Sequence, residues 1–187
     1  MNQVLETIYS RSSVRSYKSE QVPDDVLKEV IKAGFHAANG MNTQSLRFAV
    51  ISNKDKINSY SDKGKKLFLG WIRSTDNPDM QLTQMMESDM NIFYNAPTVI
   101  FVFADNTAFT PSEDTALAAG NIMLAAKSFG LGTCWIGFAS MLGMDKDFVE
   151  DTKSDGLNLT AALVIGYPTK TPSPTPRGEV PILSWKK

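Results

Sequence analysis

The hydrophobic pattern predicts that the most apolar helix of the chain runs from about residue 110 to 130. Thr110 can cap its start, Pro111 suits the first helical position, and Gly130 can adopt the left-handed conformation that ends a helix. Apolar and small side chains occupy most of its circumference: Ala116, Leu117, Ala118, Ala119, Gly120, Ile122, Met123, Leu124, Ala125, Ala126 and Phe129. Since a helix without a wide polar face is buried on every side, we expect a core helix that a second subunit also covers.

The same pattern predicts the other elements and a single domain. Further helices are expected at residues 2–9, 22–37, 55–61, 80–93 and 145–152, and strands at 46–51, 96–104, 133–138 and 157–165. A chain of 187 residues is long enough for one domain with a substantial core. His36 lies near the end of the second helix, where a capping or helix-dipole role is expected.

Two segments fall outside this regular alternation. Residues 53–93 carry methionines and aromatic residues that could form a lid over a pocket or a satellite of the core. Residues 168–187 contain five prolines, which exclude a helix and indicate an extended arm: Pro168, Pro172, Pro174, Pro176 and Pro181. Because the end of this arm is apolar again, it is expected to dock across a partner subunit.

Composition narrows the possible functions. The chain is 42% apolar and 21% charged with a net charge of −1, so nothing favours a nucleic acid or a membrane surface as partner. No apolar run is long enough to cross a bilayer and the first residues lack a signal-peptide core, so a cytoplasmic location is expected. A single histidine makes a metal site improbable, and Cys134, in an apolar strand, is expected to be a small buried residue.

Two polar segments carry candidate chemistry. Arg11 and Arg15, with serine hydroxyls at Ser12 and Ser13 between them, could hold a phosphate or could belong to a solvated loop. Residues 39–44 carry three amide side chains, at Asn39, Asn42 and Gln44. These amides could bind the edges of a heteroaromatic ring or could satisfy the loop's own backbone.

Four separated pieces of sequence then resemble the nitroreductase family. The first is Arg11-Ser12-Ser13-Val14-Arg15-Ser16-Tyr17. The second is residues 38–48, ANGMNTQSLRF. The third is residues 130–137, GLGTCWIG, and the last is Gly166-Tyr167-Pro168 with a basic residue of the arm, Arg177. The pieces occur in the family's order along nearly the whole chain.

This resemblance implies a fold and a cofactor. The expected fold is an α+β sandwich, in which helices flank a central antiparallel or mixed sheet and the C-terminal arm is exchanged in a homodimer. FMN would bind at the dimer interface. NAD(P)H would deliver a hydride to flavin N5 and leave, and a nitroaromatic, quinone or related acceptor would then take its place in a ping-pong reaction. Because the cofactor carries this chemistry, no catalytic side chain is expected.

The resemblance also assigns residues to the cofactor. The FMN phosphate would be held by Arg11, Ser13, Arg15 and Arg177, and Ser12 would also bind the cofactor. The isoalloxazine ring would be lined by residues of the partner subunit and of one strand end: Asn39, Gly40, Asn42, Gln44, Trp135, Ile136 and Gly137. Backbone N–H groups of Ile136 and Gly137 would face flavin N5. Phe68, Trp71 and Phe93 would form the walls of the substrate pocket.

The chain departs from the family pattern in the second piece and in the arm. Asn39-Gly40 stands where the family has Pro-Ser, Ser45-Leu46 stands where it has Pro-Trp, and Thr175 replaces a basic residue. These departures bear on FMN affinity and substrate choice. Two alternatives stay open: a flavin-binding protein that senses or stores FMN, and a flavin-fragmenting or dehalogenating enzyme on the same fold.

Overall fold

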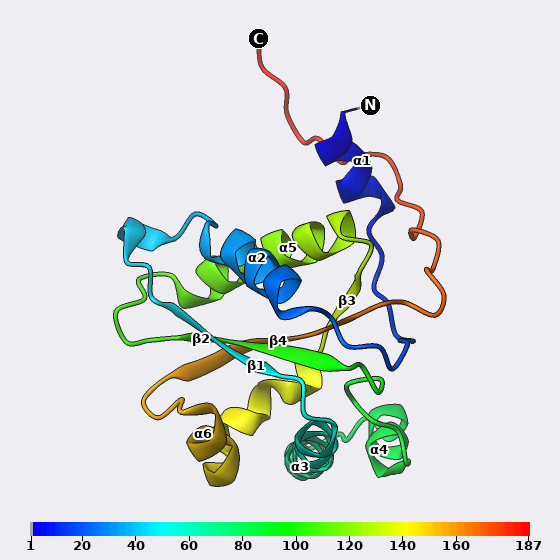
Figure 1. Ribbon diagram of the computed structural model, residues 1–187, viewed down its shortest axis with the longest axis vertical. Coiled ribbons are helices and arrows are strands. Elements are labelled where there is room, and N and C mark those ends of the chain that lie inside the picture. Colours follow the sequence, from blue (N-terminus) through cyan, green and yellow to red (C-terminus); the bar gives the residue numbers. More distant parts are fainter. Residues whose placement is uncertain (1) are drawn as a thin grey trace.

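The computed structural model describes residues 2–187 and is built on a four-stranded antiparallel sheet (Figure 1). The strands are β1 (Leu46–Ile51), β2 (Thr98–Ala104), β3 (Gly132–Trp135) and β4 (Asn158–Gly166), and they lie in the order β1-β2-β4-β3. All seven residues of β2 are buried, as expected for a central strand with both faces covered. The α+β sandwich predicted from the sequence is confirmed.

Helices cover both faces of the sheet (Figure 1). One layer contains α2 (Asp24–Phe35) and α5 (Pro111–Ser128), and the opposite layer contains α3 (Lys54–Arg73), α4 (Met80–Glu87), α6 (Lys146–Thr152) and the 3-10 helix η2 (Gly137–Met144). A short 3-10 helix, η1 (Gly40–Asn42), precedes β1, and α1 (Gln3–Ser10) lies outside the sandwich. Each layer encloses its own apolar cluster against the sheet.

The excursion between β1 and β2 forms part of one helical layer of the fold. In place of the short helix expected at residues 55–61, α3 continues without a break to Arg73 and buries Ile57, Tyr60 and Ile72 against the sheet. The helix expected at 80–93 ends at Glu87, and the chain then turns so that Ile92 and Phe93 enter the same cluster. The apolar side chains that suggested one helix over residues 80–93 therefore belong to α4 and to the turn after it, and both pack in one core.

Helix α5 is buried on one face only within the single chain. Ala118, Ala119 and Ile122 pack against α2 and the sheet, whereas Leu117 is 51% exposed and Phe129 is 48% exposed. The expectation of burial on every side therefore fails for one chain, and coverage by a second subunit stays a prediction. Thr110 precedes α5 but makes no side-chain capping hydrogen bond to its backbone.

The arm, residues 168–187, contains neither a helix nor a strand, which confirms the reading of its prolines. An isolated bridge between Tyr17 and Pro168 fixes its first residue to the N-terminal segment. Beyond that point it runs past α1, and both chain ends lie on the same side of the molecule (Figure 1). Among the residues that the structure describes, no helix is long and apolar enough to cross a membrane.

Candidate functional site

A cavity between the N-terminal segment and the arm collects three guanidinium groups. Its volume is about 750 Å³. It is lined by Ile8, Tyr9, Arg11, Ser12, Ser13, Arg15, Pro172, Ser173, Pro174, Thr175 and Arg177. Among residues 2–187, no aspartate or glutamate lines this space. We call it the arginine cavity; its charge and its hydroxyl groups suit a multiply charged anion such as a phosphate.

The two walls of the arginine cavity are distant in sequence and are joined by direct contacts. The Ser12 hydroxyl donates to the carbonyl of Pro172 at 2.9 Å, and the hydroxyls of Ser16 and Thr169 are hydrogen-bonded farther along. The backbone N–H of Val14 donates to the carbonyl of Thr133 at 2.9 Å, which seats the segment against β3. Arg11, Arg15 and Arg177 are thus brought together within one chain, as the sequence predicted for a shared ligand.

Close packing explains why the N-terminal segment lies where it does. Val14 is buried against Gly132, where an added Cβ would approach its side chain to 2.6 Å, so only glycine fits there. The Tyr17 hydroxyl donates to the Val14 carbonyl at 2.6 Å. Burial is the main cause that raises the pKa of Tyr17, so the phenol stays protonated and continues to donate.

Arg15 is braced by an aromatic ring that the sequence analysis did not single out. Its guanidinium carbon lies 5.9 Å from the ring centroid of Tyr94, a cation–π distance. Tyr94 has a left-handed backbone with φ of 53°, a conformation that a tyrosine rarely adopts. Cys134 is buried close by, and its pKa is raised chiefly by burial, which confirms the expected small buried residue and leaves a neutral thiol.

The amide loop, residues 39–44, lies far from the arginine cavity of its own chain. It precedes β1 at one end of the α2–α5 layer, and the N-terminal segment lies at the other end (Figure 1). The Asn39 side-chain oxygen accepts from the Gln44 backbone N–H at 3.0 Å, and Gln44 and Asn42 have left-handed φ angles. The loop therefore satisfies part of its own backbone, and one chain does not bring its residues to the arginines.

The end of β3 differs from the expected arrangement in one respect. The Ile136 backbone N–H donates to the carbonyl of Ala162 at 2.8 Å, so it is occupied by the sheet and is not free to face a cofactor. Gly137 begins η2, is exposed, and an added Cβ there would meet no atom within 4 Å. Trp135 is partly exposed beside it. Gly137 thus remains the candidate donor at this strand end.

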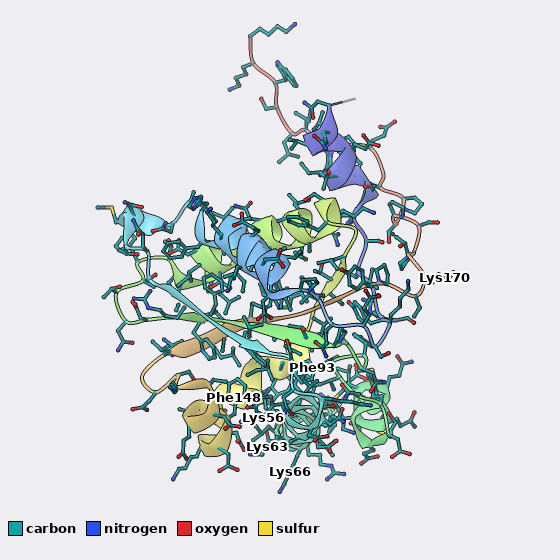
Figure 2. All side chains as sticks on the ribbon, viewed as in Figure 1. Lys56, Lys63, Lys66, Phe93, Phe148 and Lys170 are labelled. Atoms are coloured by element: carbon teal, nitrogen blue, oxygen red, sulfur yellow. The ribbon has the colours of Figure 1, made fainter. Side chains whose placement is uncertain are left out.

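Two of the three predicted substrate residues share an aromatic cluster near this strand end. The Phe68 ring lies 5.3 Å from that of Trp71 and 5.0 Å from that of Phe138, which follows Gly137 directly. Phe93, in contrast, is 0% exposed and packs edge-on against Phe101 between the sheet and the helices beneath it (Figure 2). Phe93 is therefore a core residue, because the turn before β2 directs it inward.

The remaining titratable groups add no second site. His36 is the C-cap residue of α2, in agreement with the predicted capping role. No three His, Cys, Asp or Glu side chains gather as a metal site would require among residues 2–187. Sequence reasoning missed Tyr94 and Asp114, a buried acid that contacts the amide loop. The sequence signal for Asp114 was available, since it is an acid on the apolar face of α5.

An antiparallel sheet between two helical layers, with an arginine cavity beside its edge strand β3, defines the class of fold that the sequence resemblance implied. A family model described as Nitroreductase family matches residues 8–167, which include both polar segments and the whole sheet. The chain belongs to the nitroreductase family.

Individual relatives agree with this assignment at modest identity. An iodotyrosine deiodinase from Thermotoga neapolitana is 26% identical, and the alignment covers 96% of each chain. The FMN reductase [NAD(P)H] of Bacillus subtilis is 24% identical over 95% of this chain and 70% of its own length. A nitroreductase from Bacteroides fragilis, solved with bound FMN, superposes with a TM-score of 0.85 at 26% identity over the full length of both chains.

Proposed function

We propose that the protein is an FMN-dependent oxidoreductase that uses NAD(P)H to reduce nitroaromatic, quinone or related acceptors. The observation that carries the proposal is the arginine cavity, where three guanidinium groups converge without a lining carboxylate. A dianionic phosphate needs several fixed donors, and Arg11, Arg15 and Arg177 with nearby hydroxyls match that need. The names of the relatives support the same cofactor and electron donor.

The residues around the cavity have distinct tasks in this proposal. Arg11 and Arg177 face the phosphate from opposite walls, and Ser12 fastens those walls through its bond to Pro172. Arg15, braced by Tyr94, would extend the positive charge toward β3. Gly137 would offer its backbone N–H to the flavin N5 edge, because the Ile136 N–H is already used by the sheet.

When bound, FMN supplies the two-electron chemistry by accepting hydride from NAD(P)H and passing electrons to the acceptor. The protein residues bind and orient. Cys134 keeps its proton because burial raises its pKa, so it does not serve as a nucleophile. Phe68, Trp71 and Phe138 would give an aromatic acceptor a flat apolar surface beside Gly137. Phe93 has no part in this surface.

The working unit would be a homodimer with an FMN site at its interface and an exchanged arm. Three observations support this. The amide loop and the arginine cavity lie at opposite ends of one chain, so a second copy is needed to unite them. Leu117 and Phe129 leave an apolar face of α5 exposed. The arm carries four more exposed apolar side chains, at Val180, Ile182, Leu183 and Trp185.

Reductive dehalogenation is a second candidate function on the same site. The supporting observation is the Thermotoga neapolitana relative, an iodotyrosine deiodinase that aligns over nearly the whole chain. A flavin-binding protein without turnover is the third alternative. The cytoplasmic location expected from the sequence stays a prediction.

Visible absorption spectroscopy separates these functions. The purified protein should show flavin absorption, bleach under anaerobic NADPH or NADH, and regain its colour with a nitroaromatic or a quinone. Recovery with iodotyrosine but with neither of those acceptors would favour the dehalogenase. Bound flavin that neither nucleotide bleaches would favour the sensor, and a colourless protein that cannot be reconstituted with FMN would overturn the cofactor site.

A further inference from the structure

A buried carboxylate fastens the amide loop to helix α5. Asp114 lies in the first turn of α5 and is 1% exposed. Its Oδ1 accepts a hydrogen bond from the Gly40 backbone N–H at 2.8 Å and another from the Thr110 hydroxyl at 2.8 Å. Of the hydrogen bonds that Asp114 accepts, the one from Gly40 joins two segments that are 74 residues apart.

The loop needs such an anchor because its backbone is strained. Met41, Asn42 and Gln44 all have φ angles between 50° and 53°, in the left-handed region that costs about 1 kcal/mol or more for a residue other than glycine. Such conformations persist only where the surrounding structure holds them. Beyond the loop, Arg47 donates to the Gln44 carbonyl at 2.9 Å and fixes the exit, while Asp114 fixes the entry.

The fit between Gly40 and α5 leaves no space for a side chain. A Cβ added at Gly40 would approach the Thr110 Oγ to 2.4 Å and the Phe109 Cβ to 3.3 Å. Glycine at this position, where the family pattern has serine, is thus explained by the close approach of the residues before α5. This departure from the family and the Asp114 contact belong to one arrangement.

The carboxylate uses only one of its two oxygens in these hydrogen bonds. Its second oxygen, Oδ2, is buried without a hydrogen-bond partner among the described residues. Burying a carboxylate with half of its acceptors unused costs stability, and α5 gains no side-chain cap from Thr110 in return. Because burying Asp114 in this way lowers stability, we expect its function to be holding the amide loop.

We propose that Asp114 is a positioning residue for the flavin site: it holds the amide loop in the conformation that lines the isoalloxazine ring bound to the partner subunit. This inference rests on the proposed function. Asp114 itself touches no cofactor; it acts through the Gly40 backbone. Removing it leaves the arginine cavity intact and frees the loop, so the ring loses its lining while the phosphate keeps its donors.

Two alanine variants in one helical turn test the proposal. Asp114→Ala removes the anchor, and Glu113→Ala removes a neighbouring exposed acid that does not contact the loop. Hydrogen exchange at the Gly40 amide and FMN affinity by fluorescence titration are measured for both. Asp114→Ala should speed the exchange and raise the Kd for FMN about tenfold or more, the effect of losing a hydrogen bond to a charged group. It should also shift the visible spectrum of bound flavin, whereas Glu113→Ala should match the wild type.

The outcomes distinguish this inference from the function on which it rests. A wild type that binds no FMN overturns the proposed function. A wild type that binds FMN, with Asp114→Ala unchanged in both exchange and affinity, overturns the anchoring role alone. If Asp114→Ala does not fold, Gly40→Ala displaces the same loop from outside the helix. Gly40→Ala should then weaken FMN binding, and an unchanged affinity would reject the proposal.

Discussion

The arginine cavity and the amide loop were both assigned to one ligand, yet they differ in how complete they are. The cavity is assembled within a single chain from segments about 160 residues apart, with Ser12 bonded to Pro172 across it. The amide loop is held by hydrogen bonds to Asp114 and Arg47, and it lies at the opposite end of the α2–α5 layer. Each region is built within one chain, but a single chain does not bring the two regions together.

This difference divides the predicted affinity for FMN into a contribution from the phosphate and a contribution from the ring. A phosphate-binding cavity that one chain completes should retain part of its affinity in a monomer, because its donors are fixed by intrachain contacts. A ring lining that comes from the partner should depend on assembly. The two regions can therefore be tested independently, with FMN and riboflavin as probes that differ only in the phosphate.

The largest effect is expected in the arginine cavity. The double variant Arg11→Gln/Arg177→Gln removes two charge-assisted donors, each worth roughly 1.5–3 kcal/mol, so the Kd for FMN should rise on the order of a thousandfold. Fluorescence titration measures it. Riboflavin, which lacks the phosphate, is the control ligand and should bind the variant and the wild type equally. An equal loss for both ligands would mean that these arginines do not face the phosphate.

A smaller effect is expected from shortening the arm. Deleting residues 179–187 keeps Arg177 but removes the exposed apolar side chains at Val180, Ile182, Leu183 and Trp185. If two of these side chains dock on a partner, the dimer dissociation constant should rise about a hundredfold, since each buried apolar side chain contributes roughly 1.5 kcal/mol or more. Sedimentation analysis measures it, with deletion of residues 186–187 as control. A dimer of unchanged strength would exclude an exchanged arm as its main contact.

Within the amide loop, a single hydrogen bond gives a moderate effect. Asn39→Ala removes the acceptor of the Gln44 backbone N–H, worth about 1 kcal/mol, so FMN affinity should fall about fivefold. Asn53→Ala is the matched control, because its side chain accepts from the Lys56 backbone N–H at the start of α3, away from both regions. It should lower the melting temperature by a similar amount and leave the Kd for FMN unchanged. Equal Kd values for both variants would mean that the amide loop does not contribute to FMN binding.

Much of this arrangement could be predicted from the sequence because local patterns carry it. The strands are confirmed to within two or three residues, since a run such as Val99 to Phe103 is too apolar to lie anywhere but in the centre of the sheet. The proline-rich arm followed from the chemistry of the proline ring. The grouping of Arg11, Arg15 and Arg177 came from the family resemblance, since no local pattern links the N-terminal segment to the arm.

What the sequence did not predict depends on contacts between distant segments. Phe93 was expected in a pocket and lies in the core, because it belongs to the turn before β2 and not to a helix over residues 80–93. The Ile136 N–H was expected to be free, but the pairing of β3 with β4 uses it. Asp114 was not singled out, because its role depends on its hydrogen bond to Gly40. Periodicity gives the elements but not their partners.

The smallest effect is expected at Tyr17, which follows Arg15 in the N-terminal segment that forms one wall of the arginine cavity. Tyr17→Phe removes the hydrogen bond to the Val14 carbonyl and should cost about 1 kcal/mol of unfolding free energy at neutral pH. Because burial raises its pKa, Tyr17 stays protonated in the folded state while an unfolded tyrosine ionises near pH 10. The contribution of Tyr17 to stability is thus complete below about pH 10 and is lost as the pH rises further. Denaturant titrations at pH 7 and above pH 10 measure this slope, which Tyr17→Phe should reduce.

Tyr60→Phe is the control that ties this effect to the site. The pKa of Tyr60 is also raised, first by burial and then by its hydrogen bond to Asp151 at 2.8 Å, but Tyr60 lies on α3 and does not line the arginine cavity. Both variants should therefore reduce the loss of stability at high pH, and only Tyr17→Phe should weaken FMN binding, by about fivefold or less. If Tyr60→Phe weakened FMN binding equally, the arginine cavity would depend on overall stability and not on the segment that Tyr17 holds against β3.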